Sequence, residues 1–263
     1  MQKSFQYKNA LINYRKEGEG KTVVLVHGFG EDSHIFDTQI KFLNEHCCLI
    51  VPDLPGSGQS DFINGDLSIE DYAHCIKALL DEEKISTCIM LGHSMGGYIT
   101  LAFAEKYSNY LSRFGLIHST AFADSEEKKV NRQRAIELMK KYGAYSFLKN
   151  SIPNLFSAQF KEAFPDKLES LIEASKQFST KACQQYYAAM MNRPDRTDVL
   201  KNTELPVLFI IGTEDVAAPL NDLKLQIHLP VCSYIHIIEN AGHMSLWEAA
   251  ELLNNYLLEF IID

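Results

Sequence analysis

Long apolar runs and basic clusters are both missing from this sequence. No stretch of about 18 apolar residues occurs, as a membrane-spanning helix would require, and the segment from Met1 to Tyr7 has no apolar core of a secretion signal. Lysine and arginine total 25 against 34 aspartates and glutamates, for a net charge of −9, and no basic run appears. We therefore expect a cytoplasmic protein that binds neither membranes nor nucleic acid.

Metal-binding and disulfide signatures are also missing. The sequence contains no C-x-x-C pair and no His-Glu-x-x-His motif. Its six cysteines stand mostly within apolar stretches, at Cys47, Cys48, Cys75, Cys88, Cys183 and Cys232. Buried, reduced thiols are the simplest interpretation, and nothing implies a metal or another cofactor.

What the sequence does contain is a regular alternation of apolar strand-like runs and amphipathic helical patterns. With 263 residues and 46% hydrophobic content, the chain suits one α/β domain with an insertion. The expected strands are a hairpin within 4–16, then 22–26, 47–51, 88–92, 112–118, 205–211 and 233–238. The expected helices are 35–46, one opened by the capping box at 68–71, 98–107, 221–228 and one after Met244. This order predicts a mostly parallel eight-stranded sheet with helices on both faces.

The alternation stops between the sixth and seventh expected strands. Residues 121–196 contain no convincing strand pattern, only a charged helical pattern followed by apolar and aromatic ones. We expect this segment to be a helical cap inserted after the sixth strand and lying over the carboxyl edge of the sheet. The core would then comprise 1–120 and 197–263.

The motif Gly92-His93-Ser94-Met95-Gly96 lies between an expected strand and an expected helix. In this context Gly-x-Ser-x-Gly forms a sharp turn that exposes a serine nucleophile. Glycines are needed there because the turn is strained and neighbouring backbones approach closely. The same motif also occurs by chance in many proteins, so Ser94 alone does not establish the chemistry.

Four further loops follow expected strands. The segment 27–30 has two glycines and could present backbone N–H groups to an oxyanion, although an ordinary turn would look the same. The segment 53–60 is rich in turn formers, and Asp53 is more consistent with bracing that loop than with catalysis. The other two loops are 212–215 and 242–243.

Taken together, these five segments make the chain resemble the α/β-hydrolase family, in particular its small cofactor-free members with a helical cap. They are His27-Gly28-Phe29-Gly30, Asp53-Leu54-Pro55-Gly56-Ser57-Gly58-Gln59-Ser60, Gly92-His93-Ser94-Met95-Gly96-Gly97, Gly212-Thr213-Glu214-Asp215 and Gly242-His243. All stand in the family's order, and the similarity covers essentially the whole chain outside the cap.

The resemblance implies a catalytic triad in the order Ser94, Asp215, His243. Ser94 would be the nucleophile, His243 its base, and Asp215 the carboxylate that orients the imidazole. Two other carboxylates compete with Asp215. Glu214 is adjacent to it, and Asp124 is the nearest acid after the sixth strand, where some members carry theirs.

The resemblance also implies an oxyanion hole formed by the backbone N–H groups of Phe29 and Met95. His93 is expected to be a packed or hydrogen-bonded side chain rather than a second base. We expect the substrate-binding residues to include His118, Phe122 and Met190, with burial as the alternative for His118.

These roles predict a serine hydrolase that cleaves a small carboxylic ester or related acyl compound through an acyl-enzyme. A lactonase, a carbon–carbon bond hydrolase or a perhydrolase would use the same triad, and a signalling protein that only binds its ligand would share the fold. A haloalkane dehalogenase is disfavoured, because that chemistry resembles this fold with an aspartate where Ser94 stands. The expected partner is a small ester-like molecule, and the sequence carries no information on oligomeric state.

Overall fold

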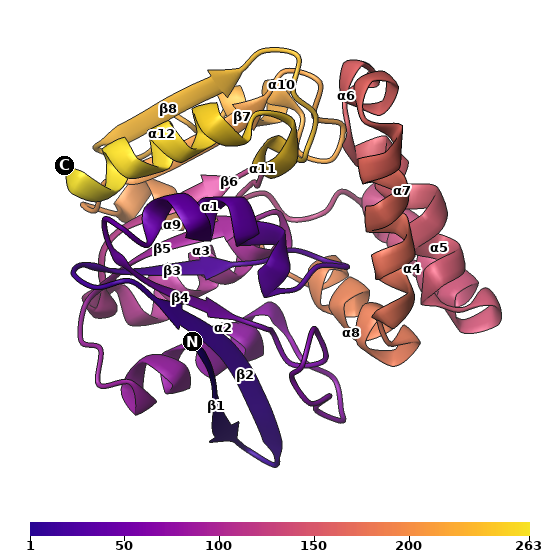
Figure 1. The fold of residues 1–263 in the computed structure, drawn as a ribbon, viewed down its shortest axis with the longest axis horizontal. Coiled ribbons are helices and arrows are strands. Elements are labelled where there is room, and N and C mark those ends of the chain that lie inside the picture. The colour runs from indigo at the N-terminus through magenta and orange to yellow at the C-terminus, as the bar shows by residue number, and fades with distance from the viewer.

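An eight-stranded sheet forms the centre of the protein (Figure 1). The structure is a computed structural model that describes all residues from 1 to 263. The strands are β1 (Gln2–Tyr7), β2 (Ala10–Glu17), β3 (Thr22–Val26), β4 (Cys48–Pro52), β5 (Cys88–His93), β6 (Leu111–Ile117), β7 (Val207–Gly212) and β8 (Ser233–Ile238). Their order across the sheet is β1-β2-β4-β3-β5-β6-β7-β8. Only β1 and β2 run antiparallel to their neighbours, so the expected mostly parallel sheet is confirmed.

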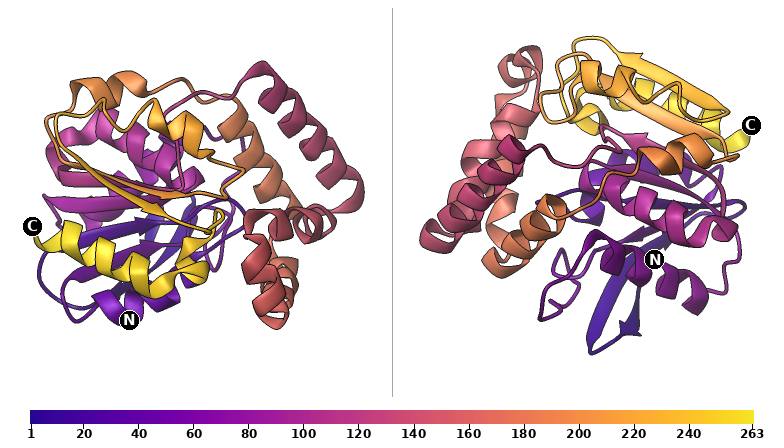
Figure 2. Two further views of the ribbon diagram at one scale, coloured as in Figure 1. Left: turned by 90° about the horizontal axis from the view of Figure 1, so that it is seen from above. Right: turned by 180° about the vertical axis from the view of Figure 1, so that it is seen from behind.

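Helices cover both faces of this sheet because its central strands are apolar on both sides (Figures 1 and 2). In β3, Val24 points into one hydrophobic cluster and Val23 into the other. The first cluster includes residues of α2 (Ile69–Glu82) and α3 (Met95–Tyr107), and the second includes residues of α1 (Asp37–Leu43) and α12 (Ala250–Ile262). Side chains of a strand alternate between faces, so one five-residue strand anchors both helical layers.

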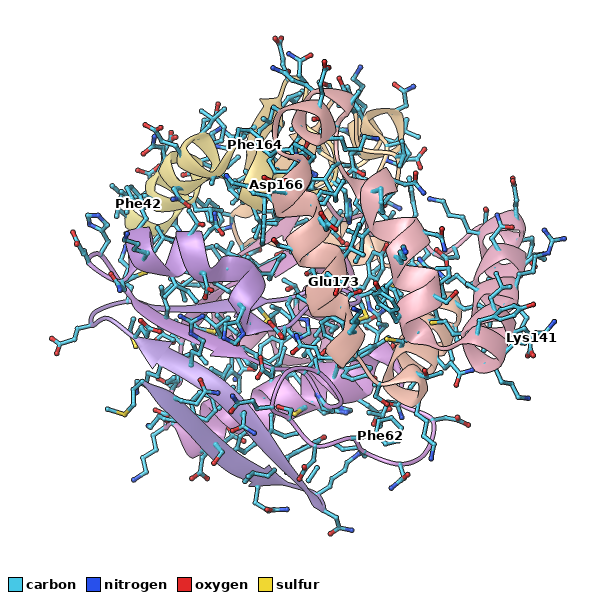
Figure 3. All side chains as sticks on the ribbon, turned by 45° about the vertical axis from the view of Figure 1, so that its right-hand side comes forward. Phe42, Phe62, Lys141, Phe164, Asp166 and Glu173 are labelled. Atoms are coloured by element: carbon cyan, nitrogen blue, oxygen red, sulfur yellow. The ribbon has the colours of Figure 1, made fainter.

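Between β6 and β7 the chain forms five helices that stand apart from the sheet (Figures 1 and 2). They are α4 (Glu126–Tyr142), α5 (Ala144–Ser151), α6 (Ala158–Ala163), α7 (Pro165–Ala174) and α8 (Thr180–Met191). α4 packs on α8 and α5, and α5 also contacts α7. Figure 3 labels Lys141 near the end of α4 and Glu173 on α7. The following α9 (Thr197–Asn202) packs on α3 of the core.

The register of the parallel strands brings their terminal loops to one edge of the sheet. Val26 of β3 lies opposite Gly92 of β5, and His93 of β5 lies opposite Ile117 of β6. On the other side, β7 and β8 end together, with Gly212 opposite Ile238. Because parallel strands end on the same side, the loops that follow β3, β5, β6, β7 and β8 converge there.

Several boundaries differ from the sequence-based expectation. The helix expected at 35–46 is a 3₁₀ turn (Ser33–Phe36) followed by α1, which ends at Leu43. The helix expected at 221–228 is the short α10 (Leu220–Lys224). It ends early because the N–H groups of Leu225 and Gln226 bond to carbonyls three residues back instead of four. The last helix is preceded by a short one, α11 (Ser245–Glu248).

Other local expectations are met. Ser68 and Asp71 form the predicted reciprocal capping box at the start of α2. Five of the six cysteines are buried, whereas Cys232 is exposed. No helix is both long enough and apolar enough to span a bilayer.

Candidate active site

Ser94 occupies a strained position in the turn between β5 and α3. Its backbone has φ 53° and ψ −117°, a conformation that is unfavourable for a residue with a Cβ. The turn is possible because Gly92 and Gly96 have no side chains. A Cβ on Gly96 would lie 2.1 Å from the carbonyl oxygen of Val26, and one on Gly92 would lie 2.1 Å from that of Gly96. The two glycines thus let β3, β5 and α3 meet closely enough to fix Ser94 at the sheet edge.

His243 and Asp215 lie in the loops after β8 and β7 and are hydrogen-bonded to each other. The Nδ1 of His243 is 2.9 Å from Oδ2 and 3.0 Å from Oδ1 of Asp215. The His243 ring also lies beside the residue that precedes Ser94, with its centroid 5.1 Å from that of His93. The backbone N–H of His243 donates to the Leu155 carbonyl at 2.7 Å, which ties this loop to the inserted helices. The structure therefore brings the three expected triad residues to one edge of the sheet.

Asp215 has hydrogen-bond partners in addition to His243. Its Oδ1 accepts from the backbone N–H groups of Ala217 at 2.8 Å and Ala218 at 2.9 Å, and its Oδ2 lies 3.0 Å from Nδ1 of His118. Burial alone would raise the pKa of Asp215, but the His243 and His118 rings outweigh burial and hold that pKa well below its ordinary value. The carboxylate is therefore ionised at neutral pH.

His118 is the second imidazole on this carboxylate. It is completely buried, its φ is 51°, and its Nε2 lies 2.7 Å from the Ser245 hydroxyl. Burial lowers its pKa in spite of Asp215, so the ring is neutral and its Nδ1 donates to Asp215. Both ring nitrogens of His118 are therefore occupied, by Asp215 and Ser245. This burial replaces the expected contact of His118 with substrate.

Glu31, which the sequence reading did not single out, braces the loop after β3. Its Oε2 accepts from the Gly28 backbone N–H at 2.6 Å and lies 3.0 Å from Nδ1 of His93, whose Nε2 lies 3.0 Å from the His243 carbonyl. Burial opposes this ion pair, but the two groups lower the pKa of Glu31 and raise that of His93. His93 is therefore a hydrogen-bonded structural side chain, as predicted.

The backbone N–H groups of Phe29 and Met95 make no hydrogen bond within the protein. Phe29 lies in the loop that Glu31 braces, and Met95 follows Ser94 at the start of α3. A Cβ on Gly28 would lie 3.0 Å from the Ser94 Cβ, so this loop directly abuts the serine. Unsatisfied N–H groups next to a serine are the donors that an oxyanion needs.

The other expected site residues have mixed placements. Asp53 braces its loop as predicted, accepting from the backbone N–H groups of Ser33 at 2.9 Å and Gln59 at 3.0 Å. Met190 is 3% exposed, packs in the hydrophobic core and does not line the small cavity beside Phe29. Phe122 is half-buried, and its carbonyl accepts from Arg193 at 2.9 Å.

A cavity of about 80 Å³ lies between the loop after β3 and the inserted helices. It is mainly apolar and is lined by Phe29, Gly30, Glu31, Ile35, Leu148, Ser151, Ile152, Leu155, Leu171, Tyr187 and Met244. A larger cavity of about 430 Å³ runs along α7, and neither cavity is lined by a triad residue. The smaller cavity is bounded by Phe29 and by Met244, the residue after His243.

His118, Asp215 and His243 also offer ligand-type atoms within 4.8 Å of one another. In this structure both imidazole Nδ1 atoms are instead hydrogen-bonded to Asp215. A neutral imidazole whose Nδ1 donates a proton keeps only Nε2 as a lone-pair donor. We therefore interpret these residues as a hydrogen-bonded network.

Comparison with known proteins identifies the family of the chain. Residues 21–250 match the sequence model of the alpha/beta hydrolase fold family. The chain is 28% identical over 263 residues to a 2-hydroxy-6-oxononadienedioate/2-hydroxy-6-oxononatrienedioate hydrolase of Paraburkholderia phymatum, with 95% of this chain and 90% of the relative covered.

Two solved structures have similar folds. A thermophilic esterase from Thermogutta terrifontis superposes with a TM-score of 0.91 at 28% identity, covering 95% of this chain and 93% of the esterase. The enol-lactonase from Burkholderia xenovorans LB400 superposes with a TM-score of 0.92 at 22% identity, covering 99% of this chain and 100% of the enol-lactonase. This similarity shows the fold alone. The chain therefore belongs to the alpha/beta hydrolase fold family and is a hydrolase.

Proposed function

We propose that this hydrolase cleaves small carboxylic esters through an acyl-enzyme on Ser94. The observation that carries the proposal is the Asp215–His243 hydrogen bond of 2.9 Å beside a serine held at φ 53°. A serine hydroxyl is a weak nucleophile and needs an adjacent base. A base in turn needs a partner that selects its tautomer, and the ionised Asp215 is such a partner.

In the proposed mechanism, the Nδ1–H of His243 donates to Asp215 and leaves the Nε2 lone pair free. Nε2 takes the proton of Ser94 as Oγ attacks the ester carbonyl carbon. The negative charge that develops on the carbonyl oxygen is stabilised by the free N–H groups of Phe29 and Met95. His243 then protonates the leaving alcohol, and water releases the acid from Ser94 by the reverse sequence.

We propose residues 121–196 as the cap and the remainder of the chain as the catalytic core. The small cavity between Phe29 and the helices of this segment would hold the apolar part of the acyl group. Its volume of about 80 Å³ favours a short chain over a long one. Opening of the cap would admit larger substrates, and the cap would exclude water once closed.

Carbon–carbon bond hydrolysis on the same triad is the second candidate. It is favoured by the relative of Paraburkholderia phymatum, whose name denotes hydrolysis of oxo-dienedioates and trienedioates. A meta-cleavage product hydrolase is also among the similar folds, at 22% identity. In that reaction Ser94 and His243 would keep the same roles, but the bond that breaks would be a carbon–carbon bond.

The test is labelling with a fluorophosphonate probe, followed by kinetics on p-nitrophenyl esters of increasing acyl length. Wild type should be labelled and should hydrolyse the short esters, and Ser94→Ala should do neither. Ser112→Ala serves as the matched control, because the Ser112 hydroxyl bonds to the Cys88 carbonyl at the opposite end of the strands. If native wild type resists the probe, the nucleophilic role of Ser94 is wrong, and a protein that only binds its ligand becomes the better explanation. Labelling without ester hydrolysis would favour the carbon–carbon substrates.

A further inference from the structure

Two arginines share one aspartate in the segment between β6 and β7. The Nε of Arg132 bonds to Oδ2 of Asp124, and Nη1 of Arg193 bonds to Oδ1 of the same carboxylate at 2.8 Å. The Asp124 side chain is 1% exposed and the Arg193 side chain 3%. The Arg132 side chain is 18% exposed. The three residues, named here the arginine cluster, thus carry one positive charge in excess at a position that is only partly open to solvent. A buried charge is costly unless an opposite charge approaches it.

The two guanidinium groups are used differently. Arg193 is fully engaged at its terminal nitrogens, which also donate to the carbonyls of Met190 at 2.7 Å and Phe122 at 2.9 Å. Arg132 uses only Nε, and its two terminal nitrogens have no partner in the protein. The Nε of Arg193 is buried without a partner, whereas the terminal nitrogens of Arg132 remain accessible. Arg132 is therefore the member of the cluster that can bind a ligand.

One tyrosine packs on each guanidinium of the arginine cluster and adds a further donor. The Arg193 guanidinium lies 3.8 Å from the centre of the Tyr98 ring, and that of Arg132 lies 5.1 Å from the centre of the Tyr187 ring. Neither phenol hydroxyl hydrogen-bonds within the protein, and neither is among the polar atoms that are buried without a partner. Burial raises the pKa of Tyr187 to about 12, so its hydroxyl stays protonated and can donate. Free guanidinium and phenol donors on one positively charged wall suit a carboxylate.

This wall borders the candidate active site. Tyr98 follows Ser94 by four residues along α3, which places it about one turn, or roughly 5.4 Å of rise, from the serine. The Tyr187 ring packs against Phe29, with centroids 4.4 Å apart. Tyr187 also lines the cavity beside Phe29, and the Arg132 guanidinium lies 5.1 Å from the centre of that ring, so the arginine cluster adjoins the cavity of the candidate site.

We propose that Arg132, Tyr98 and Tyr187 form a carboxylate-binding subsite, so that the preferred substrates are small esters carrying a carboxylate a few carbons from the ester group. The inference rests on the proposed function for the reaction that follows binding, and on the arginine cluster for the binding itself. The apolar cavity beside Phe29 then receives the uncharged part of the substrate. Arg193 and Asp124 hold Arg132 in place and do not contact the ligand.

Binding is tested apart from catalysis with the Ser94→Ala protein and isothermal calorimetry. Monomethyl glutarate should bind at least tenfold more tightly than methyl pentanoate, its neutral analogue of similar length. Arg132→Gln in the same background should abolish this difference. Arg134→Gln should preserve it, because Arg134 lies on the same helix but on its exposed side. Equal binding of the two esters, or equal effects of the two substitutions, would overturn the subsite.

Kinetics provide the second measurement. We expect the ratio of kcat/KM for the p-nitrophenyl monoester of glutaric acid to that for p-nitrophenyl pentanoate to exceed one in wild type. Arg132→Gln should lower this ratio roughly 10- to 100-fold, the effect of losing a charged hydrogen bond. If that variant does not fold, Tyr98→Phe removes a hydroxyl without a protein partner and should lower the ratio several-fold. A ratio that none of these variants changes would contradict the subsite.

The two proposals fail in different ways. If the neutral ester is hydrolysed with Ser94 labelled but the carboxylate confers no advantage, the subsite is wrong and the serine hydrolase proposal stands. If the Ser94→Ala protein binds monomethyl glutarate through Arg132 but wild type neither reacts with the probe nor cleaves either ester, the proposed reaction is wrong and the subsite stands.

Discussion

Replacing Asp215 by Asn tests the triad most directly, because it changes one oxygen and keeps the shape of the side chain. In wild type, Oδ1 accepts from two backbone N–H groups, those of Ala217 and Ala218, and Oδ2 faces the rings of His118 and His243. The oxygen of an asparagine must stay on the backbone donors, since an NH₂ group there would oppose them. The NH₂ group therefore faces the two rings, and His243 has to accept at Nδ1 and carry its proton at Nε2. In that tautomer Nε2 cannot take the proton of Ser94.

The expected loss follows from this tautomer change. A base held in the wrong tautomer lowers kcat by about 10⁴-fold in the serine triads for which it has been measured, which equals about 5 kcal/mol of transition-state stabilisation. The free energy of unfolding should fall by less than this. The backbone hydrogen bonds survive, and exchanging a charged for a neutral partner at a buried site costs about 1–3 kcal/mol. Activity should thus fall much further than stability.

The assay is kcat for a short p-nitrophenyl ester together with the free energy of unfolding in urea. Asp53→Asn is the matched control, because Asp53 is equally buried and accepts from the backbone N–H groups of Ser33 and Gln59 without touching His243. We expect this control to lose similar stability and to retain kcat within about tenfold, since only loop hydrogen bonds change. A folded Asp215→Asn protein with more than a tenth of wild-type kcat would refute the assignment of Asp215.

Three further expectations follow from the same geometry. His118→Asn, which suits the left-handed backbone at φ 51°, should lower kcat for a short p-nitrophenyl ester roughly tenfold, the value of one good hydrogen bond, because Asp215 then loses one of its two imidazole partners. An unchanged kcat would argue against a positioning role for His118. Gly96→Ala places a Cβ 2.1 Å from the Val26 carbonyl oxygen and should cost several kcal/mol of unfolding free energy in urea, so an unchanged urea midpoint would contradict the close packing of this turn. Burial alone would raise the pKa of Asp215, but its two histidine partners hold it below the ordinary value, so its contribution to stability is complete above about pH 3.9 and declines as the pH falls below that value. Unfolding free energies between pH 4 and pH 2 should therefore fall less steeply in Asp215→Asn than in wild type, and parallel curves would show that Asp215 contributes nothing.

Much of the fold could be read from local patterns. The β-branched run 22–26 became β3 with unchanged ends, and 233–238 became β8. The first of these runs is informative because a strand buried on both faces has no polar alternation to confuse with a helix, whereas β8 is only partly buried. Helix ends were less predictable, as α10 shows, because the last turn depends on which carbonyl each N–H reaches.

The meeting of Ser94, Asp215 and His243 at one sheet edge was also predictable in outline. Each follows a strand, and parallel strands end on the same side. The sequence did not reveal Glu31 or the true partner of His118. These contacts join residues 62 and 97 positions apart in the chain, and no local spacing reports such pairs. The core packing of Met190 was not predictable for a related reason, since an apolar helical residue has the same pattern whether it faces a pocket or the core.

The sequence by itself therefore determined the succession of strands and helices along the chain, the sharp turn at Ser94 and the loops in which the candidate triad stands, because backbone preferences and apolar periodicity are local properties. Only the tertiary structure decided how the polar side chains pair. It placed two imidazoles on Asp215, joined Glu31 to His93, and left Arg132 with free donors above Tyr187. Those pairings depend on side-chain direction and on burial that strengthens each charge, and both arise only when distant segments pack together.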